Sequence, residues 1–482
     1  MIYKLLGYAP DEDPTIPGVL VNCSGVVPSL KGMKGAPSPA STPLTTLGAT
    51  CQGAAVLVKP DLTSRFFAGT PTKIYEAGAS TWADVSRSAV YSVASNGRWR
   101  FAQSNSASLA VNAANTMQAA VSSGNFSDVA GAPIAAIVET VGNFVFALNL
   151  STAANGWQCA AINTYDNWTI SANVQGVAGS LTSTPGPILA GRSFGTQLVV
   201  YKRNSMYLGT YVGTPVVWQF DKIPGNAGAL SQEVVVNIGT SDNPKHIFMG
   251  EDNFYVYDGS KPVPIGDNRV NQTVFGALAQ NRYYACQALH DKKNFLVYFY
   301  YPVADSAFPD HCVVYNYRVN RWGVDDRQIQ ATVEYVAPSI TYNTLGNFYT
   351  TYEDFPNLPY DSAFLGSTAS FPAIFDMGNS VKTLTGPATT TSFTTGDIGD
   401  DVNVASITRI RPRFLTAPTS ATWTHYYRMV SGAAFSSDNA VSLVNGTFDN
   451  MREARWHRGM VQCVGDWEMA ALSIEGSGGS LE

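Results

Sequence analysis

The feature that most constrains the fold is a strand-and-turn unit that recurs along the chain roughly every 40 to 60 residues. Each unit combines runs of aromatic and β-branched residues with short turns containing Gly, Asn or Asp. Six units can be recognised, at residues 66–86, 109–131, 144–168, 197–220, 247–260 and 295–322. A repeat of this length built from strands is typical of a β-propeller, so we expect an all-β fold with about six blades.

Local turn chemistry supports the strand interpretation. Asp258 and Gly259 separate two aromatic-rich runs, and Asp-Gly favours a tight turn because glycine readily adopts a positive φ. Residues 107–121 are rich in alanine and are also compatible with a helix. We expect strands there, because this segment matches the neighbouring units.

Composition divides the chain into four parts. Residues 1–50 are rich in Pro, Gly, Ser and Thr without a helical period, which predicts an extended N-terminal arm. Residues 51–380 hold the propeller blades. Residues 381–475 are expected to form a C-terminal β segment that closes or caps the propeller. Residues 476–482 are mostly Gly and Ser and are expected to form a flexible tail.

The charge pattern gives no sign of a tight nucleic-acid interface. Charged residues make up 14% of the 482 residues, the formal net charge is −6, and no basic run occurs. This fits an ordinary mildly acidic surface. It also fits a surface that lets DNA pass, because Lys and Arg contacts to phosphate would retain it. No uninterrupted apolar run approaches the length of a membrane span, so none is expected.

No motif indicates a metal, cofactor or catalytic centre. The five histidines do not form an HExxH pattern, and neither a GxSxG elbow nor a phosphate-binding loop is present. We therefore expect no enzymatic activity, catalytic residues, cofactor or metal. The cysteines do not form CxxC pairs; buried thiols are the favoured interpretation, although an even number also permits disulfides. They stand at positions 23, 51, 159, 286, 312 and 463.

One run is not explained by periodicity. Residues 97–103, GRWRFAQ, follow the motif at 82–86 and precede the motif at 125–133. Further matches lie at residues 165–169 and 211–221. In this order the motifs resemble the tail-nozzle proteins of short-tailed double-stranded DNA bacteriophages, also called packaged-DNA stabilisation proteins. The resemblance extends over residues 45–330 and is looser in the C-terminal quarter.

The resemblance implies a β-propeller subunit of a phage tail, assembled in the host cytoplasm and located in the virion. Six copies would form a ring below the head-to-tail adaptor ring. That ring would extend the DNA conduit, help to retain the packaged genome, and dock tail fibres, spikes or a plug. Double-stranded DNA would pass through it transiently and without sequence specificity.

Two loops are then of interest. A conduit should present acidic or neutral groups to DNA, which makes the acidic residues Asp397, Asp400 and Asp401 candidates for the channel lining. Solvated loop positions are the simpler interpretation of the same residues. Residues 305–310 have the character of an insertion and are a candidate for the nozzle tip.

The alternative function is a carbohydrate-binding or glycoside-hydrolysing β-propeller. Hydrolysis of glycosides needs two carboxylates across a cleft, a pattern that one sequence does not exclude. The Ser-x-Asp-x-Gly-x-x-Trp boxes of sialidase-like propellers do not occur at the corresponding turns. The aromatic run at residues 298–301 could stack on sugar rings, but we expect it to pack between blades, because alternate strand residues face opposite sides.

Overall fold

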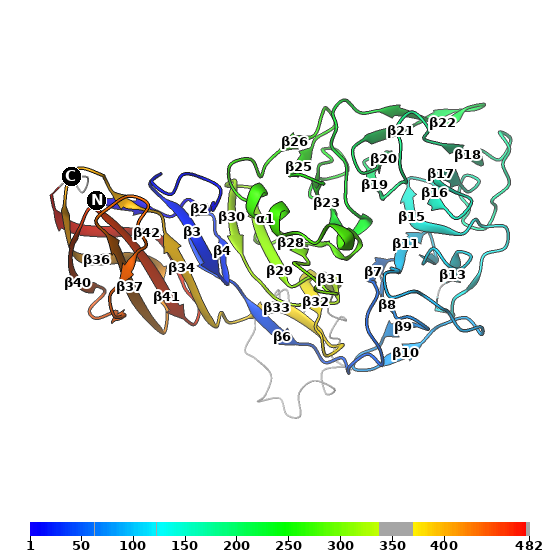
Figure 1. Ribbon diagram of the computed structural model, residues 1–482. Helices are drawn as coiled ribbons and strands as arrows, with labels where there is room; N and C mark the ends of the chain where they lie inside the picture. The colour runs from blue at the N-terminus through cyan, green and yellow to red at the C-terminus, as the bar shows by residue number, and fades with distance from the viewer. Residues whose placement is uncertain (62, 122, 337–369, 479–482) are drawn as a thin grey trace.

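The computed structural model describes residues 1–482 apart from 62, 122, 337–369 and 479–482. The described chain folds into a ring of small β-sheets with a β-sandwich beside it (Figure 1). The helices in this part of the chain are short: η1 (Gln232–Val234), α1 (Asn271–Ala277) and η2 (Gln280–Ala285). None of them is long or apolar enough to span a membrane.

The ring contains four-stranded antiparallel sheets that follow one another along the chain. The first three blades consist of β7 (Ala54–Val58), β8 (Ser64–Gly69), β9 (Ile74–Ala77) and β10 (Trp82–Asp84); β11 (Arg100–Ser104), β12 (Ala107–Val111), β13 (Gln118–Val121) and β14 (Ser127–Asp128); and β15 (Ala135–Val141), β16 (Phe144–Leu150), β17 (Ala153–Cys159) and β18 (Val177–Ser180). The next three consist of β19 (Ala190–Phe194), β20 (Gln197–Tyr201), β21 (Met206–Gly213) and β22 (Val217–Lys222); β23 (Val235–Asn237), β24 (His246–Met249), β25 (Phe254–Tyr257) and β26 (Val263–Pro264); and β27 (Gln287–Asp291), β28 (Leu296–Tyr301), β29 (His311–Asn316) and β30 (Arg321–Val324).

A further blade is assembled from both ends of the propeller sequence. Its inner three strands are β31 (Ala331–Val336), β32 (Ser370–Phe375) and β33 (Val381–Gly386), and its outer strand is the N-terminal β6 (Ser38–Ser41). The inner strands β7, β11, β15, β19, β23, β27 and β31 contact one another in that order, and β31 contacts β7. The ring is therefore a closed β-propeller.

The fold-class prediction is confirmed: the chain is all-β and contains a propeller. The six units expected from the sequence correspond to the first six blades. The additional sheet of β31, β32, β33 and β6 has no continuous sequence repeat, because its strands come from distant segments. Residues 107–111 and 118–121 form strands β12 and β13, as expected.

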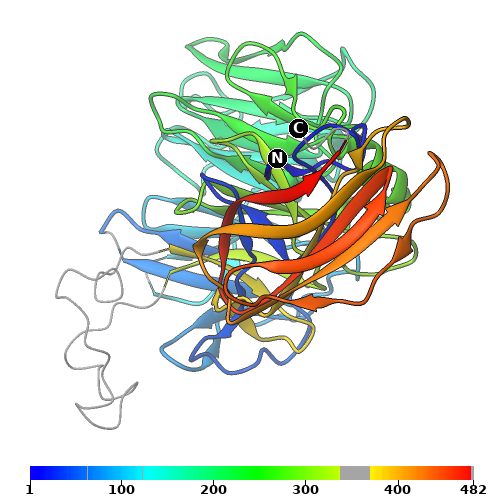
Figure 2. The same ribbon diagram turned by 90° about the vertical axis from the view of Figure 1, so that its left-hand side faces the viewer.

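The sandwich combines the first and last segments of the chain. One sheet contains β4 (Val26–Pro28), β5 (Met33–Gly35), β42 (Glu468–Ser477), β36 (Ala405–Thr416) and β40 (Phe448–Ala454), with β1 (Ile2–Lys4) paired to β42. The other contains β2 (Gly7–Tyr8), β3 (Val19–Ser24), β34 (Thr390–Thr395), β41 (Trp456–Val464), β37 (Ser420–Arg428) and β38 (Ser436–Ser437), with β35 (Ile398–Gly399) on β41 and β39 (Val441–Ser442) on β37. Figure 2 shows the sandwich in front of the ring.

The sandwich has its own apolar core between the two sheets. Trp423 of β37 and Phe448 of β40 stack with their ring centroids 6.2 Å apart, and both side chains are buried. Trp467 and Phe393 pack nearby at 5.8 Å. This core, distinct from those of the blades, makes the sandwich a second structural unit.

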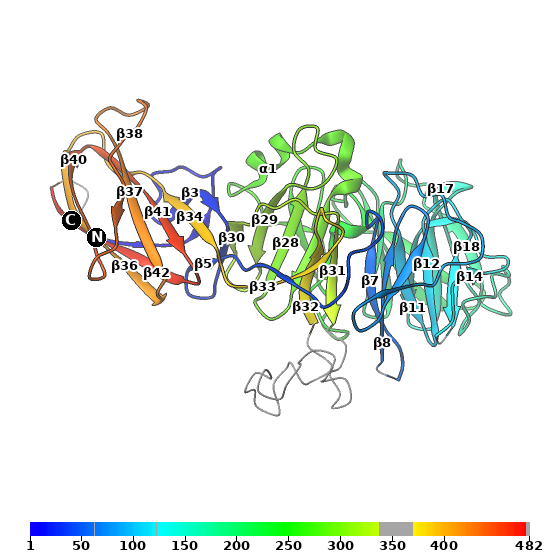
Figure 3. The ribbon, with the colours of Figure 1, turned by 90° about the horizontal axis from the view of Figure 1, so that it is seen from below.

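A shared sheet connects the two units. Strand β30, the outer strand of the sixth blade, pairs with β4, which pairs with β5, which pairs with β42 of the sandwich. Figure 3 shows β30, β5 and β42 following one another from the ring towards the sandwich. Backbone hydrogen bonds therefore continue from the propeller into the sandwich, which restricts motion between them.

Three boundaries expected from composition are wrong. Residues 1–50 are not an extended arm, because β1–β5 belong to the sandwich and β6 to the propeller. Residues 381–475 close the propeller only through their first strand, β33, which belongs to the last blade. The segment from β34 onward builds the sandwich and does not cap the propeller. Gly476 and Ser477 are not part of a flexible tail, since both pair with β36. The remainder of the expected tail, 479–482, lies outside the described residues.

Candidate functional site

The axis of the propeller carries a group of charged side chains contributed by the inner strands. Arg98 lies two residues before Arg100, the first residue of β11, and both line a cavity at the axis. Trp99 points the other way, into the first blade, where its indole N–H donates to the Thr70 carbonyl at 2.8 Å. The run at 97–103, which periodicity does not explain, thus places Trp99 in the core of the first blade and two arginines at the axis.

Two ion pairs join different blades near the axis, and the first of them reaches across it. Arg100 binds Glu233 with two hydrogen bonds of 2.7 and 3.0 Å and also donates to the Ala136 carbonyl at 2.9 Å. Burial opposes ionisation of Glu233, but the Arg100 guanidinium outweighs it and lowers the pKa of that carboxyl. Arg192 lies 3.6 Å from Glu139, whose pKa is raised by burial.

Glutamine side chains tie neighbouring inner strands together. Gln232 makes two hydrogen bonds to the backbone of Gly191, at 2.7 and 2.8 Å, and so joins the fourth and fifth blades. Gln287 bridges Gln330 and Thr332 and joins the sixth and last blades. The Gln330 side chain accepts from the Cys51 amide at 2.8 Å, next to the first blade. These bonds fix the inner strands at the ring centre.

The remaining space at the axis is small. The cavity lined by Arg98, Arg100, Arg192 and Glu233 measures about 120 Å³.

 The separate cleft between the propeller and the sandwich, described below, has a volume of about 350 Å³. A second hollow of about 270 Å³ on the propeller is also lined by Arg100, together with Arg203 and Tyr284. A DNA duplex does not fit through an axis of this size.

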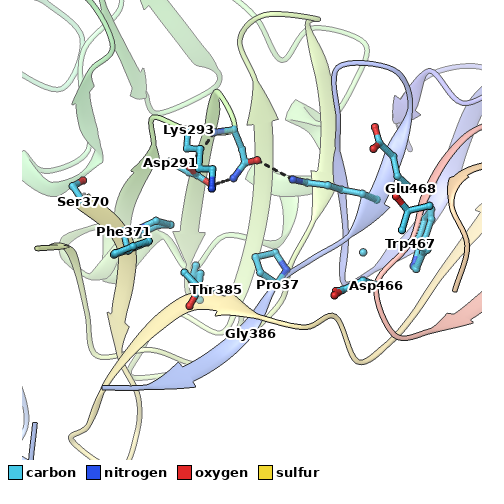
Figure 4. Close-up of a pocket in the computed structure, with 16 residues that line it drawn as sticks. Pro37, Asp291, Lys293, Ser370, Phe371, Thr385, Gly386, Asp466, Trp467 and Glu468 are labelled. Atoms are coloured by element: carbon cyan, nitrogen blue, oxygen red, sulfur yellow. Dashed lines mark hydrogen bonds between the residues drawn. The ribbon is translucent and has the colours of Figure 1, made fainter. Parts of the chain in front are cut away.

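The cleft between the propeller and the sandwich is crossed by a chain of polar contacts (Figure 4). Lys34 of β5 donates to the Asn294 side chain at 3.0 Å, and Asn294 donates to Asp291 of β27 at 2.6 Å. Burial lowers the pKa of Lys34. On the sandwich side, Asp466 accepts from the Ala388 amide at 2.6 Å, and Trp467 donates to Thr391 at 2.7 Å. The Lys34–Asn294 hydrogen bond joins the two units, whereas the Trp467–Thr391 bond lies within the sandwich.

The acidic residues expected to line a channel lie at one end of the sandwich. Asp397 is buried and accepts hydrogen bonds from Arg428 at 2.8 Å and Arg458 at 2.5 Å. Its prediction as a channel-lining residue is wrong, because its charge is compensated inside the protein. Asp400 caps the backbone amides of Val402 and Asn403.

Asp401 is exposed and accepts from the Trp456 indole at 2.9 Å. The structure brings Asp397, Asp400 and Asp401 together around β35, but away from the propeller axis. For Asp400 and Asp401 the channel-lining role stays a prediction, since it concerns an assembly of several copies.

The aromatic run at residues 298–301 is buried on both sides of β28. Tyr298 and Tyr300 pack with residues of the last blade, whereas Phe299 packs against Phe254 of the fifth blade with ring centroids 4.8 Å apart. The predicted packing between blades is confirmed, and the run offers no surface for stacking on sugars.

The cysteines are free thiols, and all six are buried. Burial raises the pKa of the Cys51 and Cys286 thiols to about 12, which keeps them protonated and unreactive. The favoured interpretation of the cysteines is confirmed. Within the described ranges, no group of three or more His, Cys, Asp or Glu side chains is arranged to hold a metal ion.

Sequence reasoning missed the axial group as a site. The Arg-x-Arg spacing at 98 and 100 was a signal, since two cations that line one cavity must find partners. The partners Glu233 and Glu139 lie in other blades and carry no local motif.

Comparisons with known proteins do not identify a family for this chain. The sequence matches no family model and no curated protein. A computationally designed protein, Ika8, is similar at 10% identity, over 72% of this chain and 99% of its own, with a TM-score of 0.36. The WD40 domain of Neurospora crassa Pan2 is similar at 8% identity, over 69% of this chain and 88% of its own, with a TM-score of 0.35. The fold assignment rests on the strand order and ring closure.

Proposed function

We propose that this chain is a structural subunit of a bacteriophage tail nozzle. Several copies, six by the resemblance in motif order, form a ring that extends the DNA conduit below the adaptor ring. The ring helps to retain packaged DNA and docks tail fibres, spikes or a plug. The chain itself performs no chemistry in this role.

The observation that carries the proposal is the sheet shared by the propeller and the sandwich. A conduit wall must hold its shape under the load of packaged DNA, so its subunits need rigid internal connections. Pairing of β30 with β4 and of β5 with β42 provides a backbone connection, and Lys34 and Asn294 add a side-chain connection. Separate domains on a flexible linker would serve this purpose poorly.

The closed propeller axis determines where a conduit can lie. Because the axial cavity of one propeller is too small for a duplex, DNA would pass through the bore between copies. The motif at 97–103 supports this arrangement, since its arginines are used within the propeller axis and are not presented to a conduit.

Immunogold electron microscopy of phage-like particles from the source lysate tests the proposal. An antibody against this chain should place gold at a single vertex, at the tail, while an antibody against a capsid protein labels the whole shell. Unlabelled particles, with the chain left in the soluble fraction, would contradict the proposal. A screen for glycan binding and hydrolysis would then test the alternative function.

A further inference from the structure

The charges at the propeller axis do not balance. Three arginines, Arg98, Arg100 and Arg192, face two glutamates, Glu139 and Glu233. Arg100 is fully engaged by Glu233 and the Ala136 carbonyl. One positive charge therefore remains without a carboxylate in this group.

Arg98 is the arginine that lacks a counter-charge. Within the described residues its guanidinium makes one hydrogen bond, to the Gln330 carbonyl at 3.2 Å, and forms no ion pair. Its Nε is buried without a partner. Burial of an unpaired charge is unfavourable, and it lowers the pKa of Arg98.

Arg192 faces the same cavity and is also incompletely engaged. It lies 3.6 Å from Glu139 and makes a long hydrogen bond of 3.5 Å to the Gln232 carbonyl, with 36% of its side chain exposed. The cavity of about 120 Å³ has room for several water molecules or for one small oxyanion. Guanidinium groups bind such anions through paired N–H donors.

We propose that the axial cavity binds a small oxyanion, such as phosphate, between Arg98 and Arg192. The anion supplies the missing negative charge and joins the second blade to the fourth across the axis. The hollow that shares Arg100 lies next to this cavity. This inference does not depend on the proposed nozzle function.

Thermal unfolding of the full chain in increasing inorganic phosphate tests the proposal, with chloride used to keep the ionic strength constant. A ligand that binds the folded state raises its stability by mass action. We expect Tm to rise by a few degrees with phosphate in the wild-type chain and in the control Arg413→Gln, whose side chain is exposed on β36. The rise should be lost in Arg98→Gln.

An equal rise in Arg98→Gln, or no rise in the wild type, would overturn the proposal. Circular dichroism will show whether Arg98→Gln folds. If it does not, Arg98→Lys keeps the charge without the paired donors and should show a weaker phosphate response than the wild type. Phosphorus NMR of phosphate with the wild-type chain gives a second readout: saturable line broadening is expected, and its absence would overturn the proposal.

Discussion

Val26 of β4 pairs with Val324 of β30, and through this pair the sheet of the sixth blade continues into the sandwich. The neighbouring Gly323 lies against the same strand. A Cβ added at Gly323 would overlap the Val26 carbonyl oxygen, so the close approach of the two backbones requires glycine here.

Replacing Gly323 should therefore weaken the pairing of β30 with β4, which forms the junction between the propeller and the sandwich. We expect Gly323→Ala to separate β30 from β4 and to increase cleavage between the propeller and the sandwich in limited proteolysis. Gly276→Ala is the control, because no atom lies within 4 Å of a Cβ at that position. Equal cleavage of the two variants would show that the shared sheet does not control the junction.

Asp397 should contribute strongly to the stability of the sandwich. Its carboxylate is 1% exposed and pairs with Arg428 and Arg458, which both also lie over the Phe435 ring. Asp397→Asn leaves the two guanidiniums without their counter-charge, and we expect a loss on the order of 3 kcal/mol in urea unfolding. Asp400→Asn should change stability little. Similar small effects for both would contradict the buried ion-pair interpretation.

Buried histidines should make the fold sensitive to mild acid. Burial lowers the pKa of His246, His290 and His425 to about 4. The unfolded chain takes up protons on these groups as pH falls through about 6.5, whereas the folded chain remains neutral until about 4. Their contribution to stability is thus complete above about pH 7 and is lost between about pH 6.5 and 4.

Urea unfolding at several pH values checks this prediction. The free energy of unfolding should fall from pH 7.5 to pH 5, and the fall should be smaller in His290→Gln. A flat profile over this range would refute the prediction.

The hydroxyl of Tyr300 should not stabilise the fold. It is buried between blades and has no hydrogen-bond partner among the described residues. Removing an unpaired buried polar group is neutral or favourable, so Tyr300→Phe should leave stability unchanged or raise it by about 1 kcal/mol. Tyr3→Phe is the contrast, because Tyr3 donates to Val19 at 2.6 Å and accepts from Gly396 at 2.9 Å. Chemical unfolding should show a loss only for Tyr3→Phe.

Local patterns were sufficient to predict the first six blades but not the last one, whose strand β6 comes from a distant segment. The Asp-Gly turn after β25 depends on neighbours close in sequence, and Gly259 has the expected positive φ of 105°. The sandwich could not be predicted in this way. Its strand β3 pairs with β34, so Cys23 lies opposite Phe393, and no local pattern in either segment specifies that pairing.

The candidate site was only partly visible for the same reason. The run containing Arg98 and Arg100 could be recognised as unusual, but its partner Glu233 lies 133 residues beyond Arg100. Likewise, Asp397 was assigned to a solvated or channel-lining loop because its partners Arg428 and Arg458 come from other strands. In both cases the charged partners are distant in sequence, and the fold alone brings them together.

The most direct test of the central claim is a cryo-electron microscopy reconstruction of the tail vertex of particles that contain this chain. We predict a closed ring of six copies, with each propeller and sandwich fitted as one rigid body and the bore lying between copies. A tail vertex without density for this fold would contradict the account. Duplex DNA passing through the axis of an individual propeller would contradict it as well.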